Sequence, residues 1–174
     1  MFKATEQIET ATLQDVEELE MLINSAYRGE SSKKGWTTEA DLLGGIRIDK
    51  EAITELISRN DSVILKFTES GKIIGCVNLV TKGNSIYLGM LTVSPIEQGK
   101  GIGKELIISS EKHAQNARVK EIEMTVISKR TELIAYYERR GYQQTGEKRP
   151  FPMNDPRFGE PKTDLEFVVL KKSY

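Results

Sequence analysis

The sequence has too few cysteine and histidine residues for a disulfide framework or a metal site. Its 174 residues contain one cysteine, Cys76, and one histidine, His113. A single cysteine cannot form an internal disulfide, and a structural zinc site needs about four cysteine or histidine ligands. We therefore expect neither a metal site nor a catalytic Cys–His pair.

The chain also lacks an excess of one charge and any long hydrophobic run. Lysine and arginine total 25 and aspartate and glutamate total 26, so the formal net charge is −1. This balance offers no broad field for nucleic acid or an anionic membrane. No apolar run approaches the roughly 20 residues of a bilayer span. The start, MFKATEQIET, has no signal-peptide character. We expect a cytoplasmic protein without nucleic-acid or membrane partners.

The hydrophobic pattern predicts one α/β domain over residues 1–174. Spacing of three and four residues favours helices, and alternation favours strands. Hairpins come first and strand–helix–strand units follow, so we expect an α+β arrangement. Its sheet should be mixed and mostly antiparallel, with about six to seven strands and about four flanking helices. The expected helices cover residues 13–27, 38–43, 51–59, 101–116 and 130–140. The expected strands cover residues 2–11, 63–67, 73–80, 85–93, 121–127, 142–145 and 165–170.

Four details of this pattern can be compared directly with a structure. Thr12 stands where an N-cap residue would, with Asp15 three positions later as in a capping box. Residues 149–162 hold four of the five prolines, which favours a surface loop. The predicted buried stripe of the first helix is Leu13, Val16, Leu19, Leu22 and Ile23. In strand 85–93, alternation puts Ile86, Leu88 and Met90 on one face and Tyr87, Gly89 and Leu91 on the other.

Three glycines lie between a predicted strand and a predicted helix, in the stretch LTVSPIEQGKGIGKELI. Pro95 lacks a backbone donor and ends the strand, and Gly99, Gly101 and Gly103 then lead into the helix. Free N–H groups at a helix start, together with the positive end of the helix dipole, bind phosphate oxygens. Two lysines in the stretch add positive charge. The loop therefore suggests a phosphate site, with a glycine-rich turn that binds nothing as the alternative.

The spacing of the glycines excludes two common phosphate-binding loops. A Walker loop has four residues between its first glycine and a Gly-Lys pair that Ser or Thr follows. Here three residues separate Gly99 from Gly103, and a glutamate follows Lys104. The dinucleotide fingerprint needs a third glycine where this chain has Lys104. The remaining pattern is Gln-x-x-Gly-x-Gly, formed by Gln98, Gly101 and Gly103.

This stretch resembles the signature of the GNAT superfamily of acyl-CoA-dependent N-acetyltransferases. A second stretch, AYYERRGY at residues 135–142, resembles another motif of the family, in which a tyrosine lies four residues before a Gly-aromatic pair. The two motifs occur in the family's order with one strand between them, and the order of elements agrees with the family fold. The resemblance implies transfer of an acetyl group from acetyl-CoA to an amine by direct attack in a ternary complex.

The resemblance also assigns residues to the cofactor, acetyl-CoA. Backbone groups of Leu91 and Val93 would pair with the pantetheine arm, and amides from Gln98 to Lys104 would hold the diphosphate. Arg130 stands where the family often has an asparagine that contacts the cofactor arm, so it would reach a phosphate instead or start the helix from outside. The predicted cofactor-binding residues are Leu91, Thr92, Val93, Gln98, Gly99, Lys100, Gly101, Ile102, Gly103, Lys104, Ser128, Arg130 and Tyr137.

The second motif assigns the role of general acid to Tyr137. A phenol, with a pKa of about 10, is protonated at neutral pH and can donate to a departing sulfur, whose thiol has a pKa of about 8.5. Tyr136 points about 100° away on the same helix, so one of the two tyrosines could pack in the core. The acceptor amine must lose a proton, and Glu97, Glu123 and a bound water are the candidate bases. The charges of residues 138–140 are expected to face solvent.

The irregular segment after the first helix contains the predicted acceptor site. In the family fold this region resembles a flap over the acceptor, and here it contains Tyr27, Arg28, Trp36 and Arg47. The loop at residues 149–152 would close the other side. Aromatic and arginine side chains suit a small amine that carries a carboxylate, such as an amino acid.

Functions of other kinds stay open on the sequence alone. The chain could acetylate a protein or peptide amine, hold acyl-CoA as a sensor without catalysis, or serve as an interaction domain without a ligand. One sequence also leaves open whether the chain forms a homodimer.

Overall fold

The computed structural model describes residues 7–174. The strands in this part of the chain are β1 (Ile8–Thr10), β2 (Leu43–Gly44), β3 (Ser62–Glu69), β4 (Lys72–Lys82), β5 (Ser85–Val93), β6 (Glu121–Ile127), β7 (Gln143–Pro150), β8 (Glu160–Pro161) and β9 (Glu166–Ser173). The helices are α2 (Val16–Tyr27), α3 (Gly29–Ser32), α4 (Lys50–Ser58), α5 (Ile102–Asn116) and α6 (Thr131–Glu138). Three 3₁₀ turns are η1 (Leu13–Asp15), η2 (Pro95–Glu97) and η3 (Pro156–Phe158).

The described strands form a mixed sheet, as predicted. Seven of them pair in the order β1-β3-β4-β5-β6-β9-β7, and β2 pairs separately with β8. Every neighbouring pair in the large sheet is antiparallel except β5 with β6, which is parallel. Within residues 7–174, every helix is too short or too polar to cross a lipid bilayer.

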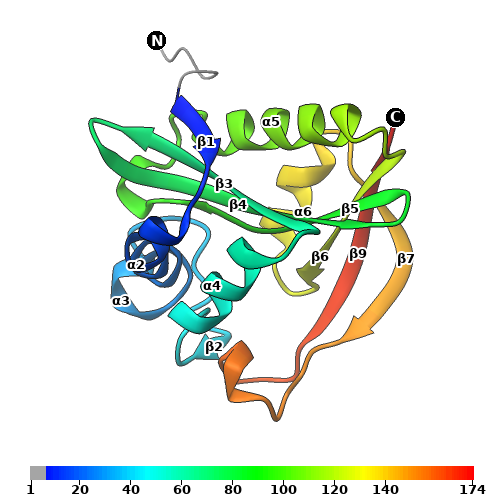
Figure 1. Cartoon of the computed structure of the whole chain (residues 1–174). Coiled ribbons are helices and arrows are strands. Elements are labelled where there is room, and N and C mark those ends of the chain that lie inside the picture. The colour runs from blue at the N-terminus through cyan, green and yellow to red at the C-terminus, as the bar shows by residue number, and fades with distance from the viewer. Residues whose placement is uncertain (1–6) are drawn as a thin grey trace.

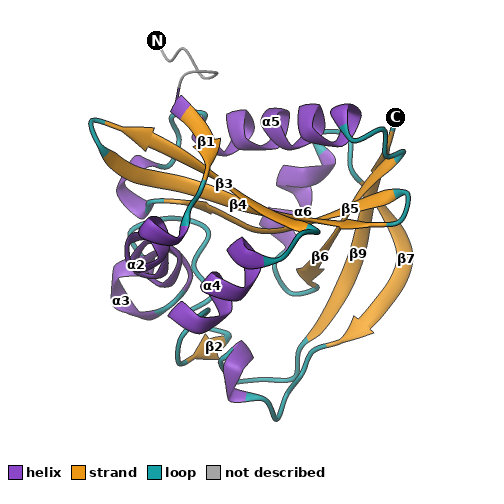
Figure 2. Ribbon diagram, viewed as in Figure 1, coloured by secondary structure: helices purple, strands orange, loops and turns teal. Residues whose placement is uncertain are grey.

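Helices cover both faces of the sheet (Figures 1 and 2). Helix α5 lies across one face with α6 beside it, and α2 and α4 lie on the other. Because each face of a sheet must bury its apolar side chains, each has its own core. The core on the α5 side includes Phe67, Leu79, Ile86, Ile102, Leu106 and Ile122. The core on the α2 side includes Leu19, Ile23, Ile53, Ile64, Ile73 and Cys76.

Strands β5 and β6 pair over only a short distance. Their parallel register joins Ser85–Tyr87 to Glu121–Glu123 and then stops. Beyond that point β5 stays paired with β4 and β6 stays paired with β9, so the two strands diverge (Figure 1). The divergence places the ends of β5 and β6 around the cavities described below.

A bulge at Met90 changes which face of the sheet the end of β5 presents. The register between β4 and β5 shifts between Cys76 and Asn78, and Met90 has a φ of 51°. Met90 therefore packs in the core on the α2 side, whereas Leu88 and Leu91 pack on the α5 side. The prediction that Met90 shares a face with Leu88 is wrong, because a bulge interrupts simple alternation. A positive φ in a residue other than glycine is strained, and such strain is concentrated at functional sites.

Most of the predicted elements are confirmed, and the departures have local causes. The capping box is present, with the Thr12 N–H donating to the Asp15 carboxylate at 2.8 Å. Leu13 is 57% exposed because it lies in η1, ahead of the helix proper. Residues 38–42 form irregular structure and a turn that lead into β2 rather than a helix. The edge strand β7 continues to Pro150, since an edge position requires no ladder donor there. Residues 2–6 of the predicted first strand lie outside the described residues.

Candidate active site

A cavity of about 360 Å³ lies at the start of α5 and is called the donor cavity below. Its wall combines the end of β5, the glycine loop, one side of α6 and two residues that follow α3, Trp36 and Thr37. The predicted cofactor-binding residues that line it are Leu91, Val93, Gln98, Gly99, Gly101, Ile102, Gly103, Lys104 and Tyr137. The fold thus brings most of the predicted cofactor residues to one cavity.

The glycine loop meets two different structural requirements. Gly99 and Gly101 both have a φ of 84°, a conformation that strains residues with a Cβ, and Gly101 is the N-cap of α5. A Cβ built at either position meets no atom of the described residues within 4 Å. At Gly103, by contrast, a Cβ would lie 2.7 Å from the Tyr136 hydroxyl. The first amides of α5 therefore lie beside open space, and this cradle fits a diphosphate group.

The side chain of Gln98 joins the glycine loop to the segment that precedes β2. Its Oε1 accepts from the Trp36 N–H at 2.8 Å, and its Nε2 donates to Thr37 Oγ1 at 2.8 Å and to the Val93 carbonyl at 3.2 Å. A Cβ at Gly35 would overlap the Gln98 side chain, so glycine permits this close approach. Gln98 thus holds one wall of the donor cavity in place through contacts within the protein.

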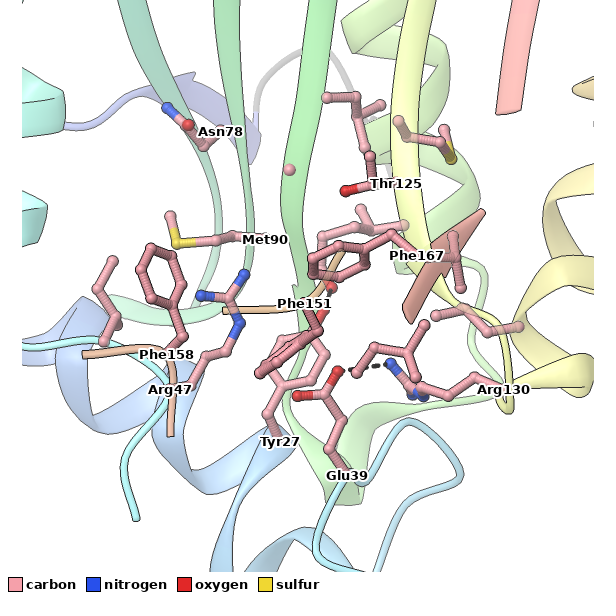
Figure 3. Close-up of a pocket in the computed structure, with 18 of the residues that line it drawn as sticks. Tyr27, Glu39, Arg47, Asn78, Met90, Thr125, Arg130, Phe151, Phe158 and Phe167 are labelled. Carbon is pink, nitrogen blue, oxygen red and sulfur yellow. Dashed lines mark hydrogen bonds and ion pairs between the residues drawn. The ribbon is translucent and has the colours of Figure 1, made fainter. Parts of the chain in front are cut away.

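A second cavity, also of about 360 Å³, opens where β5 and β6 diverge and is called the acceptor cavity (Figure 3). Three residues of the predicted acceptor site, Tyr27, Arg28 and Arg47, line it, whereas Trp36 lines the donor cavity. The predicted loop contributes Phe151 and the proline that follows it. The acceptor cavity lies on the side of the sheet that carries α2 and α4.

The two cavities meet at Tyr137. Both are lined by Tyr27, Leu91, Leu133 and Tyr137. Tyr137 is only 5% exposed, and its hydroxyl forms no hydrogen bond with residues 7–174. Burial raises the pKa of Tyr137 well above its ordinary value, so the phenol keeps its proton. A protonated donor without a partner therefore lies between the two cavities.

Tyr27 closes part of the same junction from the other side. Its hydroxyl donates a hydrogen bond to the carbonyl of Leu91, near the end of β5. Burial raises the pKa of Tyr27 to about 12, so this phenol also stays protonated. The Leu91 carbonyl has a second lone pair and can still accept another hydrogen bond.

Arg130 belongs to the acceptor cavity rather than to the donor cavity. Its Nη1 donates to Glu39 Oε2 at 3.1 Å, and its Nη2 donates to the Thr37 carbonyl at 2.5 Å. Arg28 binds the other oxygen of the same carboxylate, with Nη2 2.9 Å from Oε1. Figure 3 shows Glu39 and Arg130 at the edge of the cavity next to Tyr27. One buried carboxylate therefore joins two arginines that are 102 positions apart in the chain.

Several other predicted residues lie away from both cavities. Thr92 is buried and donates to the Met90 carbonyl at 2.8 Å. Lys100 forms an ion pair with Glu97, one of the candidate bases. The Ser128 N–H donates to the backbone of β9. The other candidate base, Glu123, forms an ion pair with Arg149 at 2.7 Å. None of these residues lines either cavity in the described part of the chain.

Sequence reasoning missed several residues that shape the site. Glu138 and Arg139 are exposed, as predicted, whereas Arg140 is partly buried; both arginines line the donor cavity, which the sequence did not indicate. Their spacing from Tyr136, three and four residues along one helix, was the available signal. The guanidinium of Arg140 lies 3.4 Å from the centre of the Tyr136 ring. Glu39 carried no local signal, because its partners are distant in sequence.

Comparisons with known proteins show that this chain is of the acetyltransferase class. A family model described as an acetyltransferase (GNAT) domain matches residues 37–152. This match covers more than half of the chain, and the chain belongs to the GNAT acetyltransferase family. The cofactor of this family is acetyl-CoA. A protein of Bacillus subtilis (strain 168), the uncharacterized protein YdhI, is 32% identical over 75 residues, which are 43% of this chain and 46% of that protein. The match thus spans less than half of that relative's length.

Solved structures show the same fold at low sequence identity. The PaiA N-acetyltransferase of Thermoplasma acidophilum, in complex with coenzyme A, has a TM-score of 0.70 at 19% identity, over 97% of this chain and 98% of that chain. The ribosomal-protein-S18-alanine N-acetyltransferase of Escherichia coli has a TM-score of 0.70 at 14% identity, over 95% and 92%. An IAA acetyltransferase of Bacillus cereus has a TM-score of 0.67 at 15% identity, over 96% and 98%. The names of these proteins differ in acceptor, so the fold alone does not specify one.

Proposed function

We propose that this protein is an acetyl-CoA-dependent N-acetyltransferase that acetylates the amine of a small molecule. The observation that carries the proposal is the meeting of the donor and acceptor cavities at Tyr137. The family's cofactor, and the coenzyme A in the Thermoplasma structure, support acetyl-CoA as the donor. The volume of the acceptor cavity, about 360 Å³, supports a small ligand.

The residues of this chain would bind and orient acetyl-CoA and would protonate the leaving sulfur. Acetyl-CoA supplies an acetyl group activated as a thioester. The first amides of α5 would hold its diphosphate, and Leu91 and Val93 at the end of β5 would align its arm along the donor cavity. Tyr137 would hold a proton on Oη and donate it to the sulfur as the carbon–sulfur bond breaks.

Glu39 is the one carboxylate that lines the acceptor cavity in residues 7–174, and two arginines occupy it. Water is therefore our choice of acceptor for the amine proton.

Replacement of Tyr137 by phenylalanine tests the proposal, with Tyr136→Phe as the matched control. Tyr136 precedes Tyr137 on the helix but lines only the donor cavity. We expect Tyr137→Phe to lower kcat by about 10²- to 10⁴-fold, the usual contribution of a general acid. Its affinity for acetyl-CoA should stay close to that of the wild type, and Tyr136→Phe should keep its kcat. The measurements are thiol release with a panel of amines and calorimetry with acetyl-CoA.

Two outcomes would contradict the proposal. Equal kcat in Tyr137→Phe and the wild type would remove the assigned general acid. Tight binding of acetyl-CoA without turnover on any amine of a broad panel would favour a sensor instead of an enzyme.

A further inference from the structure

The acceptor cavity carries more positive than negative charge. Its charged lining residues are Arg28, Arg47, Arg130 and Glu39, so three guanidinium groups face one carboxylate. The walls leave little room for water, because Arg28 and Glu39 are 5% and 7% exposed. A cavity with an uncompensated positive charge and low-dielectric walls favours an anionic ligand.

Two of the three arginines are already engaged by the protein. The carboxylate of Glu39 binds Arg28 through one oxygen and Arg130 through the other. Each arginine also donates to a backbone carbonyl, Arg28 to Ile46 at 2.8 Å and Arg130 to Thr37 at 2.5 Å. Most N–H donors of these two guanidinium groups already have partners within the protein. Arg28 and Arg130 therefore hold the cavity wall together and are poor candidates for binding a ligand.

Arg47 differs from both of them. Its guanidinium forms no ion pair or hydrogen bond with residues 7–174, and it lies over the ring of Tyr27, 5.8 Å from the ring centre. Figure 3 shows this guanidinium inside the cavity, between Phe158 and Phe151. An arginine fork without a partner matches the geometry of a carboxylate, which it can bind through two parallel hydrogen bonds.

The position of Arg47 limits how far the carboxylate can lie from the reacting amine. Tyr27, which Arg47 contacts, borders both cavities. A carboxylate on Arg47 therefore lies near the junction where the amine must meet the donor. This arrangement favours an acceptor whose amine and carboxylate are separated by few bonds.

The rest of the wall is aromatic and apolar. Phe151 and Phe167 pack with ring centres 5.2 Å apart, and Phe158 lies across the cavity from them (Figure 3). Met90, which the bulge in β5 turns to this side of the sheet, adds a flexible thioether. Such a wall suits an apolar or aromatic substituent and gives no carboxylate that could bind a polyamine.

We propose that Arg47 binds the carboxylate of the acceptor and that the acceptor is a free amino acid with an apolar or aromatic side chain. This inference rests on the proposed function, because it names the substrate class of the same site. Peptides and polyamines are the competing acceptors, and they lack a carboxylate beside the reacting amine.

The test compares free amino acids with their amides, in which a neutral amide group replaces the carboxylate. The panel is phenylalanine, leucine and methionine, the three corresponding amides, spermidine and a short peptide, with acetyl-CoA as the donor. We expect the wild type to prefer each acid over its amide in kcat/KM by about 10- to 100-fold, the value of a charged hydrogen-bonded pair. Arg47→Ala should abolish this preference by raising KM for the acids, with kcat and the KM of acetyl-CoA little changed.

Two further variants serve as controls. Arg47→Lys keeps the charge but loses the fork, so it should recover part of the preference. Arg59→Ala removes an exposed arginine that pairs with Asp61 outside both cavities, and it should behave like the wild type. The comparison of acid with amide uses wild-type protein, so the test does not depend on any variant folding.

The outcomes separate this inference from the proposed function. Three results would overturn the inference and leave an N-acetyltransferase. They are equal use of acids and amides, a preference for acids that survives in Arg47→Ala, and activity confined to spermidine or the peptide. Absence of turnover with every amine would overturn both.

Discussion

Tyr137 gets its proposed chemistry from burial. A phenol has an ordinary pKa of about 10, and burial raises the pKa of Tyr137 well above that value. The folded state therefore binds this proton more tightly than the unfolded state. The resulting contribution to stability is present below about pH 10 and is lost as the pH rises through the folded pKa. Across the range in which the enzyme would work, the phenol remains a proton donor.

This protonation state predicts the shape of the pH profile. We expect kcat/KM to rise between about pH 6 and pH 10 as the acceptor amine loses its proton, because only the neutral amine attacks. We expect no descending limb in that range, since Tyr137 does not ionise there. The measurement is kcat/KM against pH for the wild type and for Tyr137→Phe. A descending limb below pH 10 that is absent from the phenylalanine variant would contradict the raised pKa of Tyr137, because it would show that this phenol ionises in that range.

Residues in compact motifs were predictable from the sequence, whereas residues with distant partners were not. Tyr137 and Gly101 lie in short stretches whose spacing carries the information, and both line the donor cavity as expected. Arg130 also lies beside a motif, but its partner Glu39 is 91 positions away. The spacing of residues within a short stretch cannot predict such a pair. The role of Arg130 in the acceptor cavity therefore needed the structure.

The same distinction holds for whole elements. The hairpin strands and α5 follow local periodicity and were predicted within a few residues. Residues 33–49 have weak periodicity, and their conformation is set by contacts with distant segments. Gln98 holds Trp36, and β8 pairs with β2. The helix predicted for residues 38–43 was wrong because these long-range contacts outweigh a weak local preference.

The contact between the glycine loop and this segment predicts an effect of Gln98→Ala. The variant loses three hydrogen bonds that hold Trp36, Thr37 and Val93, each worth about 0.5–1.5 kcal/mol. Trp36 is the one tryptophan of the chain, and its ring lies 5.2 Å from that of Tyr136. We expect a red shift of its fluorescence and a higher KM for acetyl-CoA, because a wall of the donor cavity loosens. Fluorescence spectra and initial rates measure the two effects.

The matched control for this prediction is Gln115→Ala, near the exposed end of α5 and outside both cavities. It should leave the tryptophan spectrum and the KM of acetyl-CoA unchanged. An unaltered spectrum in Gln98→Ala would show that the segment holds its position without this side chain.

At the scale of the whole molecule, the donor cavity joins parts of the fold that are far apart in sequence. Its wall includes the segment after α3, the end of β5, the start of α5 and the end of α6. A ligand that contacts all four parts binds the folded chain and not the unfolded one. At a concentration of 100 times its Kd, such a ligand stabilises the fold by about 2.7 kcal/mol. For a chain of this size that corresponds to a rise in Tm of about 5–10 °C.

Two glycine variants separate this stabilisation from a general loss of stability. Gly101 and Gly83 both have a positive φ, 84° and 61°, and both have free space where a Cβ would point. Gly83 lies in the turn between β4 and β5 and outside both cavities. Alanine at either position adds backbone strain of about 1–2 kcal/mol, so both variants should melt at a lower temperature without ligand. Only at Gly101 does the new Cβ enter the donor cavity, where it would obstruct a diphosphate. We therefore expect acetyl-CoA to raise the Tm of Gly83→Ala as it does that of the wild type, and to raise that of Gly101→Ala much less. Equal shifts in the two variants, measured by thermal unfolding at one acetyl-CoA concentration, would mean that the diphosphate binds elsewhere.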